Sequence, residues 1–283
     1  MSQPASERSS EEPSGDPLTG AEPPASASEP ARPDVPDQTA ELDAPLDRVV
    51  AINRATLRGV DFRKARFDSF SLAGCVFISC DFRAIRFDKK LQGLFTAAPH
   101  STFRDCKFDG ADLRRVRPGL ARFERCTFDD TAIDGWRTEA AEFVECRFAG
   151  ALGTVVFYGR PTGNAGRLTE AQRRRNEFSG NDFRDADLDH VTFTGGIDLR
   201  TQRLPRDERY VWLDRFPQRL ARARTDIVRW EVQEERVAAL DMLRDLTTRF
   251  RDQNEIFASR MAGAGPAARV QTRVWAELER SFG

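Results

Sequence analysis

Five cysteines are the residues of this sequence best suited to metal or redox chemistry. Three of them, Cys106, Cys126 and Cys146, recur at intervals of 20 residues, and each lies in a hexad that begins and ends with phenylalanine. Regularly spaced thiolates could ligate a metal ion. However, no histidine or acidic residue shares their position in the repeat, and a buried thiol commonly acts as a small apolar filler. We therefore predict structural cysteines, with no disulfide framework, no metal and no other cofactor.

The two histidines, His100 and His190, have no cysteine, aspartate or serine at a spacing that suggests a catalytic pair. The glycine-rich segment 159–166 is not followed by the Lys-Ser/Thr pair of a phosphate-binding loop, so we interpret it as a flexible loop. The glycine patterns of a nucleophile elbow or a dinucleotide-binding turn do not occur either. We predict that the chain is not an enzyme.

The elements that position these residues follow an unusual period. Apolar residues recur every five positions, as in Phe103, Phe108 and Leu113, with a small residue usually two positions earlier. A period of five fits neither the 3.6-residue period of a helix nor the two-residue period of a strand. It predicts an all-β solenoid in which each five-residue unit forms one side of a coil and four units close the turn.

The cysteine hexads set the alignment of successive coils. The six predicted coils begin at Leu57, Phe77, Phe103, Phe123, Phe143 and Phe178. Insertions lengthen two of the intervals, from 20 residues to 26 and to 35. Three inward columns stay apolar and stack into one core, and the third is predicted to pass through Gly153. The predicted core residues are Phe62, Phe82, Cys106, Phe108, Phe123, Cys126, Phe128, Phe143, Cys146, Phe148, Phe183 and Leu188.

The units 111–115 (Ala-Asp-Leu-Arg-Arg) and 186–190 (Ala-Asp-Leu-Asp-His) resemble those of the pentapeptide-repeat family, and similar units cover about residues 55–200. The resemblance implies a right-handed quadrilateral β-helix with the central Leu or Phe pointing inward. It also implies a protein that acts through shape and charge. The best understood members of the family are acidic DNA mimics that bind DNA gyrase and protect it from quinolones.

The fourth side of the coils is irregular, because both insertions fall on it or near it. Loops gathered on one face of a repeat protein frequently form its binding site. Four segments there carry eleven basic residues against five acidic ones, with Trp136, Phe157 and Tyr158 among them. The segments are 88–102, 114–119, 134–140 and 154–177. The candidate partner-binding residues are Arg114, Arg115, Arg117, Trp136, Arg137, Tyr158, Arg173, Arg174 and Arg175.

The two ends of the chain differ from its repeats. Residues 1–44 are rich in proline, serine and acidic residues and are predicted to form a disordered tail, since they hold too few apolar residues to fold. Residues 45–203 are assigned to the β-helix and residues 204–283 to an α-helical region. With no signal segment and no apolar run that could cross a bilayer, we expect a cytoplasmic protein with no membrane partner.

The α-helical region is predicted to contain one long amphipathic helix from Gln218, with apolar residues at helical spacing as far as Phe257. A last helix from about Ala267 carries an apolar stripe at Val270, Val274 and Leu278. Two roles suit this region. It could cap the open end of the solenoid, or form a homodimer through the stripe.

Three functions are compatible with these patterns. We favour a non-catalytic scaffold that binds a macromolecule, a protein in preference to a nucleic acid, through the basic loop face. The alternative is a gyrase-binding protein of the DNA-mimic type, and the third is direct nucleic-acid binding. Residues 1–48 hold eleven acidic residues and three arginines, so the tail either competes with an anionic partner for the basic face or only aids solubility.

Overall fold

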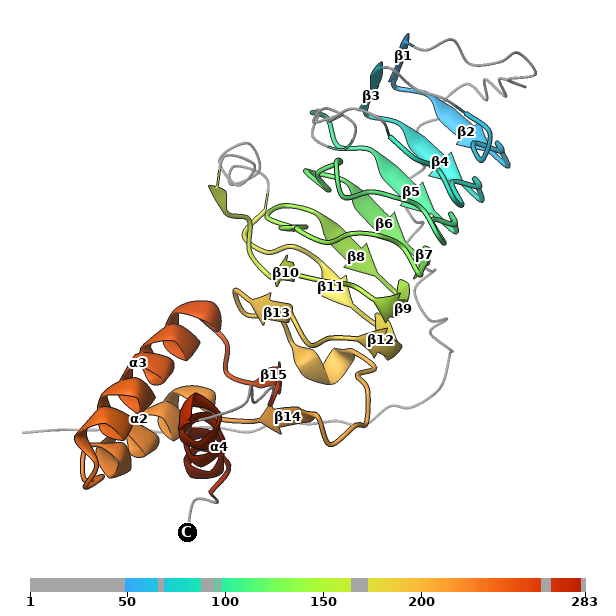
Figure 1. The fold of residues 1–283 in the computed structure, drawn as a ribbon. Coiled ribbons are helices and arrows are strands. Elements are labelled where there is room, and N and C mark those ends of the chain that lie inside the picture. Colours follow the sequence, from blue (N-terminus) through green and yellow to red (C-terminus); the bar gives the residue numbers. More distant parts are fainter. Residues whose placement is uncertain are drawn as a thin grey trace, which may run out of the picture. The chain divides into compact units, whose positions relative to one another are not determined.

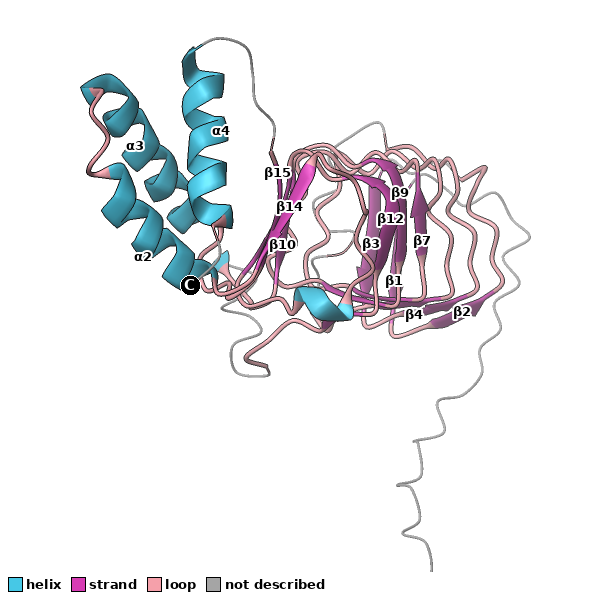
Figure 2. Ribbon diagram, turned by 90° about the horizontal axis from the view of Figure 1, so that it is seen from below, coloured by secondary structure: helices cyan, strands magenta, loops and turns pink. Residues whose placement is uncertain are grey.

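A computed structural model describes residues 49–65, 69–87, 95, 98–163, 173–260 and 266–280. The predicted tail lies outside these residues. The described part is a stack of short strands, most of them parallel, followed by three α-helices (Figures 1 and 2). The strands of the stack are β1 (Val49–Asn53), β2 (Thr56–Arg58), β3 (Ser69–Ala73), β4 (Val76–Ile78), β5 (Thr102–Arg104), β6 (Arg122–Glu124), β7 (Thr127–Asp129), β8 (Glu142–Val144), β9 (Arg147–Ala151), β10 (Val155–Tyr158), β11 (Phe178–Ser179), β12 (Asp182–Asp187) and β13 (Val191–Thr194). After a 3-10 turn (Leu199–Thr201) come β14 (Tyr210–Leu213), α2 (Phe216–Ile227), α3 (Gln233–Arg249), β15 (Ile256–Ser259) and α4 (Pro266–Glu279).

The largest sheet has the order β11-β8-β6-β5-β4-β2, and all of its pairings are parallel. The central residues of neighbouring strands are paired in register: Leu57 is paired with Phe77, Phe77 with Phe103, and so on to Phe178. This register coincides with the alignment that the cysteine hexads suggest. We call the chain segments that begin at these six residues layers 1 to 6. Parallel strands lie about 4.8 Å apart, so each layer adds about that much to the stack.

Aromatic rings fill the interior of the stack. Phe128 stacks on Phe108 at 5.1 Å and on Phe148 at 4.9 Å between ring centroids, with the rings nearly parallel. Rings of the first column meet these edge to face, as Phe123 does with Phe128. The buried residues include Phe62, Phe82, Cys106, Phe108, Phe123, Cys126, Phe128, Phe143, Cys146, Phe148, Phe183 and Leu188.

The cysteines belong to this interior and are all unpaired thiols. The Sγ of Cys126 donates to the carbonyl of Phe103 at 3.4 Å, and that of Cys146 donates to Phe123 at 3.4 Å. Burial raises the pKa of the Cys126 thiol well above its ordinary value, which keeps this thiol protonated. In the described part of the chain, no group of three His, Cys, Asp or Glu is placed to hold a metal ion.

The third column differs from the predicted one, because it contains Leu152 and not Gly153. A bulge explains the shift: Asp182 pairs with Arg147 but Asp185 pairs with Ala149, so layer 5 has one residue fewer than layer 6 at this point. Leu152 therefore reaches the interior. Gly153 turns the corner with a φ of +73°, where an added Cβ would lie 2.6 Å from a carboxylate oxygen of Asp134.

The fourth side is more regular than the sequence suggests. β10 pairs with β13 in parallel, and Phe157 stacks on Phe193 at 5.5 Å inside the core. Phe157 is fully buried, so the prediction that it lies among the basic residues of the loop face is wrong. Its strand continues the fourth column, which places the aromatic ring inward. Phe95, from the first insertion, also packs on the core, against Phe103 at 5.3 Å.

An antiparallel pair, β14 and β15, follows the last layer. The backbone N–H of Leu188 donates to the hydroxyl of Tyr210 at 2.9 Å. The Gln253 side chain accepts from the N–H groups of Gly196 and Ile197 at 2.7 Å each and donates to the carbonyl of Ile197 at 3.1 Å. These contacts satisfy backbone groups of layer 6 that no further layer covers.

The helices build a second core. The prediction of one long helix from Gln218 to Phe257 is wrong, since the chain turns between α2 and α3 and Phe257 lies in β15. The turn buries Trp230 beside this core, which one straight helix would not allow. The stripe of α4 packs into the same core, where Val274 and Leu278 are fully buried. The stripe is therefore covered within the chain and is not exposed for the predicted homodimer contact. No described helix is long and apolar enough to span a membrane.

Candidate functional site

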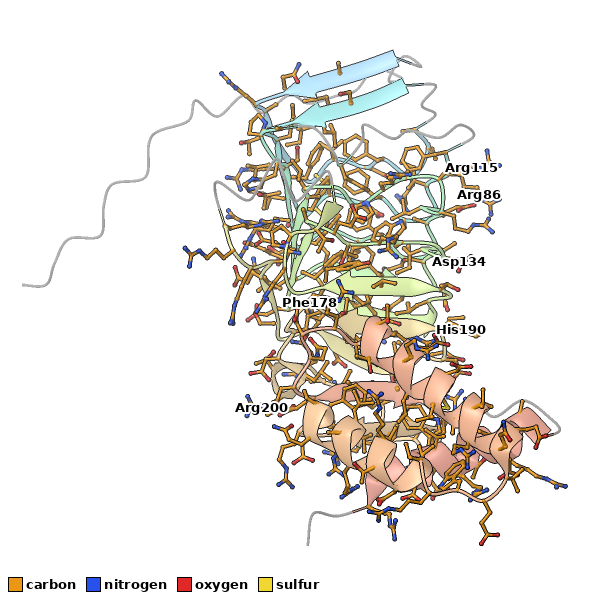
Figure 3. All side chains as sticks on the ribbon, turned by 90° about the vertical axis from the view of Figure 1, so that its left-hand side faces the viewer. Arg86, Arg115, Asp134, Phe178, His190 and Arg200 are labelled. Atoms are coloured by element: carbon orange, nitrogen blue, oxygen red, sulfur yellow. The ribbon has the colours of Figure 1, made fainter. Side chains whose placement is uncertain are left out.

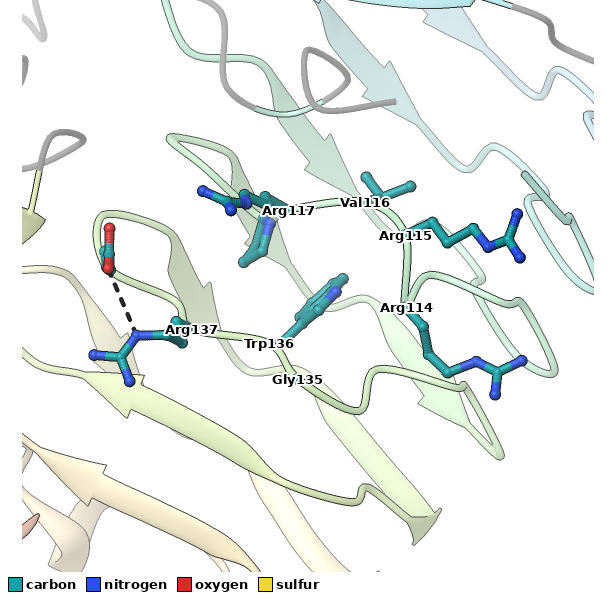
Figure 4. A pocket seen from close by; sticks show the side chains of 9 residues that line it. Arg114, Arg115, Val116, Arg117, Gly135, Trp136 and Arg137 are labelled. Carbon is teal, nitrogen blue, oxygen red and sulfur yellow. Dashed lines mark ion pairs between the residues drawn. The ribbon is translucent and has the colours of Figure 1, made fainter. Parts of the chain in front are cut away.

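Four of the predicted arginines meet at one hollow. Arg114, Arg115, Arg117 and Arg137 line a cavity of about 440 Å³, which we call the first hollow (Figure 4). The remaining lining residues are Val116, Pro118, Gly135, Trp136 and Glu139. The structure therefore brings together five of the nine candidate residues at one concave site, the four arginines and Trp136.

Two consecutive layers position these side chains in the same way. After Leu113 in layer 3, the chain turns with the N–H of Val116 donating to the carbonyl of Leu113 at 3.0 Å. In layer 4 the N–H of Trp136 donates to Ile133 at 3.0 Å. Because the corner repeats, Arg117 and Arg137 follow it at equivalent positions of the two layers, whereas Arg114 and Arg115 lie within the turn of layer 3. Figure 3 shows Arg86 and Arg115 together on one edge of the stack.

The prediction that Trp136 is an exposed aromatic residue of the basic face is wrong. Its side chain is 2% exposed and its indole N–H donates to the carbonyl of Leu113 at 3.0 Å. It occupies the position two residues before the central Thr138, where a small residue usually stands. In the next two layers this central position holds Phe157 and Phe193, which are much larger than threonine. The indole of Trp136 fills the interior space that Thr138 leaves empty.

Tyr158 anchors Arg137. The guanidinium lies over the phenol ring at 5.2 Å from its centroid, donates to the phenol oxygen, and reaches Glu139 at 3.6 Å. Burial raises the pKa of Tyr158, so its hydroxyl stays neutral. Arg114 is held in a different way, by two bonds to the carboxylate of Asp112 at 2.9 and 2.7 Å. This pairing lowers the pKa of Asp112 and keeps it ionised.

Two further hollows adjoin the first. The second hollow, of about 590 Å³, shares Arg137 with it and adds Arg160, Arg249 and Arg251. The third hollow, of about 430 Å³, shares Arg114 and Arg115 and adds Arg86. We call the arginines of the three hollows the arginine surface: Arg86, Arg114, Arg115, Arg117, Arg137, Arg160, Arg249 and Arg251.

The arginine surface carries a net positive charge. The acidic residues that line the hollows are Asp112, Glu139 and Asp252, and each forms an ion pair with one arginine of the surface. Arg117 and Arg251 are exposed and make no ion pair with any residue that the structure describes. Eight arginines and three acidic residues line the three hollows, so arginines outnumber acids there.

Arg173 does not belong to this patch. It is 20% exposed, pairs with Glu142 at 2.7 Å and donates to the carbonyl of Ala140, and burial lowers its pKa. The prediction that it offers a free charge to a partner is therefore wrong, because the guanidinium is already bound to Glu142 and Ala140 at the end of layer 4. Arg174 and Arg175 are exposed but line none of the three hollows. Lys89, Lys90 and Arg167, which the sequence adds to the basic face, lie outside the described residues.

Charges on the large sheet are paired. Arg122 contacts Glu124, Glu142 and Glu177 at 2.5, 3.0 and 2.6 Å. Arg104 pairs with Glu124, and Arg125 with Asp105, at 2.6 and 2.7 Å. Such mutual pairing leaves neither a positive nor a negative stripe on this side, so the arginine surface stands out by comparison.

His190 lines a fourth hollow of about 620 Å³, which shares Arg249 with the second hollow. Asp189 of layer 6, Asp241 and Asp245 of α3, and Trp275 of α4 also line it. His100 is exposed. The hollows of the arginine surface contain neither histidine. They offer guanidinium groups, hydroxyl groups and a few apolar side chains, and the chemistry these groups support is the recognition of carboxylate or phosphate groups.

No family model matches the chain, and no curated protein matches it. Among solved structures, a trypsin-treated variant of QnrB1, described as a plasmid-mediated fluoroquinolone resistance protein, is 20% identical at a TM-score of 0.34, covering 56% of this chain and 85% of the other. A second trypsin-treated variant is also 20% identical, with a TM-score of 0.32 and coverage of 55% and 80%. Full-length QnrB1 is 16% identical, with a TM-score of 0.19 and coverage of 55% and 82%.

Proposed function

We propose that this chain is a non-catalytic binding protein that recognises an anionic macromolecule through the arginine surface. Its scaffold is, in this proposal, a right-handed quadrilateral β-helix of the pentapeptide-repeat type. The in-register columns of Phe103, Phe123 and Phe143, twenty residues apart, support the scaffold. The observation that carries the function is the collection of eight arginines and three acids in three adjoining hollows.

Arginine suits such a surface. Its planar guanidinium binds a carboxylate or phosphate through two parallel hydrogen bonds, and it keeps its charge at any physiological pH. A positive patch also steers an anionic partner toward the site before contact. Arg114 and Arg137 are already held by Asp112 and Tyr158, which lowers the entropic cost of ordering them when a partner binds.

A protein partner fits this surface better than single-stranded nucleic acid. Proteins that bind single strands stack the bases on exposed aromatic rings. Here the indole of Trp136 is buried, and the ring of Tyr158 is covered by Arg137. The described arginine surface thus offers charge without a stacking platform.

Charge reversal tests the proposal. The variant Arg117→Glu/Arg251→Glu should weaken binding of a labelled glutamate homopolymer at least about tenfold at about 50 mM salt, where screening is weak. Fluorescence anisotropy on the full chain measures the affinity. The control Arg58→Glu/Arg229→Glu changes the net charge equally at two exposed arginines outside the hollows, and it should bind as the wild type does. Equal losses in both variants, or no binding by the wild type, would refute the proposal.

Gyrase is the alternative partner. A DNA mimic needs a continuous negative stripe, whereas the pairs Arg104–Glu124 and Arg125–Asp105 mix the signs along the large sheet. We therefore expect no inhibition of DNA supercoiling by purified gyrase at micromolar concentrations of this protein. A supercoiling assay measures this, with a quinolone as the positive control. Potent inhibition would make gyrase binding the better proposal.

A further inference from the structure

The second hollow differs from the first in its floor. Val156 and Pro161 contribute partly exposed apolar surface, and Thr192 and Thr194 lie beside them. The arginines of this hollow, Arg137, Arg160, Arg249 and Arg251, come from layers 4 and 5, from α3 and from the loop after α3. The site therefore combines an apolar floor with guanidinium groups from several elements.

The walls of the second hollow are fixed by backbone contacts. The N–H of Gly159 donates to the carbonyl of Thr194 at 2.8 Å, and a Cβ at Gly159 would come within 2.8 Å of the Gly195 carbonyl oxygen. On the opposite side, the Arg251 carbonyl accepts from the N–H of Gly195 and from the hydroxyl of Thr194, both at 3.1 Å. The loop after α3 is thus tied to layer 6, so the hollow is formed before a partner arrives.

The charges of the second hollow remain available to a partner. Arg160 lies 3.7 Å from Asp252, a loose pair in which both side chains are about half exposed. Arg249 and Arg251 are exposed and form no ion pair with a residue that the structure describes. Arg137 is already paired with Glu139, so three other arginines against one aspartate make the hollow complementary to a negatively charged group.

Resting on the proposed function, we infer that the second hollow seats one apolar side chain from an acidic segment of a partner protein. The apolar side chain fills the floor, and carboxylates on either side of it reach the arginines. Buried apolar anchors with charged neighbours commonly dominate the energy of such interfaces. A sugar-phosphate backbone would meet the same arginines but would leave the apolar floor unfilled.

Two synthetic peptides test the inference on the full-length protein. Each has about 13 residues with glutamate at alternate positions and is about 40 Å long in an extended form. One carries phenylalanine at its centre and the other carries serine. We expect the phenylalanine peptide to bind at least about tenfold more tightly, because it buries an aromatic side chain.

The variant Val156→Asp should abolish this preference by placing a carboxylate on the floor, and the two peptides should then bind with similar affinity. The control Val237→Asp makes the same change at an exposed position of α3 and should keep the preference. Thermal unfolding, followed by circular dichroism, establishes that both variants fold.

The outcomes separate the two proposals. Failure of the wild type to bind either peptide or the glutamate homopolymer overturns the proposed function. Equal binding of the two peptides would overturn the inference that the second hollow seats an apolar side chain, and would leave the proposed function standing. Tighter binding of a short DNA duplex than of the phenylalanine peptide would do the same. Loss of the preference in Val237→Asp as well would also overturn that inference, since the effect would then not depend on the second hollow.

Discussion

Replacing Phe128 with alanine should lower the free energy of unfolding by about 3–5 kcal/mol, the usual cost of removing a large buried aromatic side chain. Phe128 is fully buried and stacks on Phe108 and Phe148, while Phe123 and Trp136 meet it edge to face. The surrounding layers are hydrogen-bonded to each other and cannot collapse into the gap. Urea unfolding measures the loss.

The same variant should loosen the middle layers first, because each layer contacts only its neighbours. Hydrogen exchange should speed up in layers 3 to 5 more than in α2 or α4. The control Trp212→Ala removes an aromatic side chain that is 45% exposed and should cost much less. Equal losses in the two variants, or uniform exchange throughout the chain, would contradict an inward position for Phe128.

Replacing Asn181 with leucine should cost about 2–6 kcal/mol for a different reason. Asn181 is fully buried in layer 6, at the position that cysteine occupies in layers 2 to 5. Its side chain accepts from the N–H of Cys146 and donates to the carbonyl of Phe143, both at 2.9 Å. Leucine would leave both backbone groups buried without a partner, at about 1–3 kcal/mol each.

Urea unfolding also checks this second effect. The midpoint should fall with an unchanged dependence on urea, as expected when stability changes but the surface exposed on unfolding does not. Asn254→Leu makes the same chemical change at an exposed position and should shift stability by no more than about 0.5 kcal/mol. A shift of similar size in both variants would show that the hydrogen bonds of Asn181 do not explain the loss.

Periodicity alone predicted the pairing of the large sheet. The central residues of the repeat are bulky and recur at equal intervals, so Phe103, Phe123 and Phe143 could align in only one register. The one-residue shortening of layer 5 could not be seen, because Gly153 stands where the pattern expects the central residue and Leu152 is its neighbour. Only the bulge in β12 shows which of them points inward.

The candidate site was predicted in part. Arg117 and Arg137 follow the same corner of consecutive layers, so their 20-residue spacing places them together, and Arg114 and Arg115 lie in the turn just before Arg117. Trp136 was placed wrongly, because tryptophan at a position for a small residue gives no sign that Thr138 leaves space for it. Arg249 and Arg251 were missed as well. They belong to the helical region, and nothing in their local sequence indicates that their loop docks on layer 6.

The central claim is that the guanidinium groups of the arginine surface contact the partner. Arginine-selective dicarbonyl footprinting, read by mass spectrometry with and without the bound phenylalanine peptide, tests it most directly. We expect the peptide to slow modification of Arg117, Arg249 and Arg251 and to leave Arg58 and Arg229 unchanged. Full occupancy by the peptide with undiminished modification of Arg117, Arg249 and Arg251 would contradict the claim.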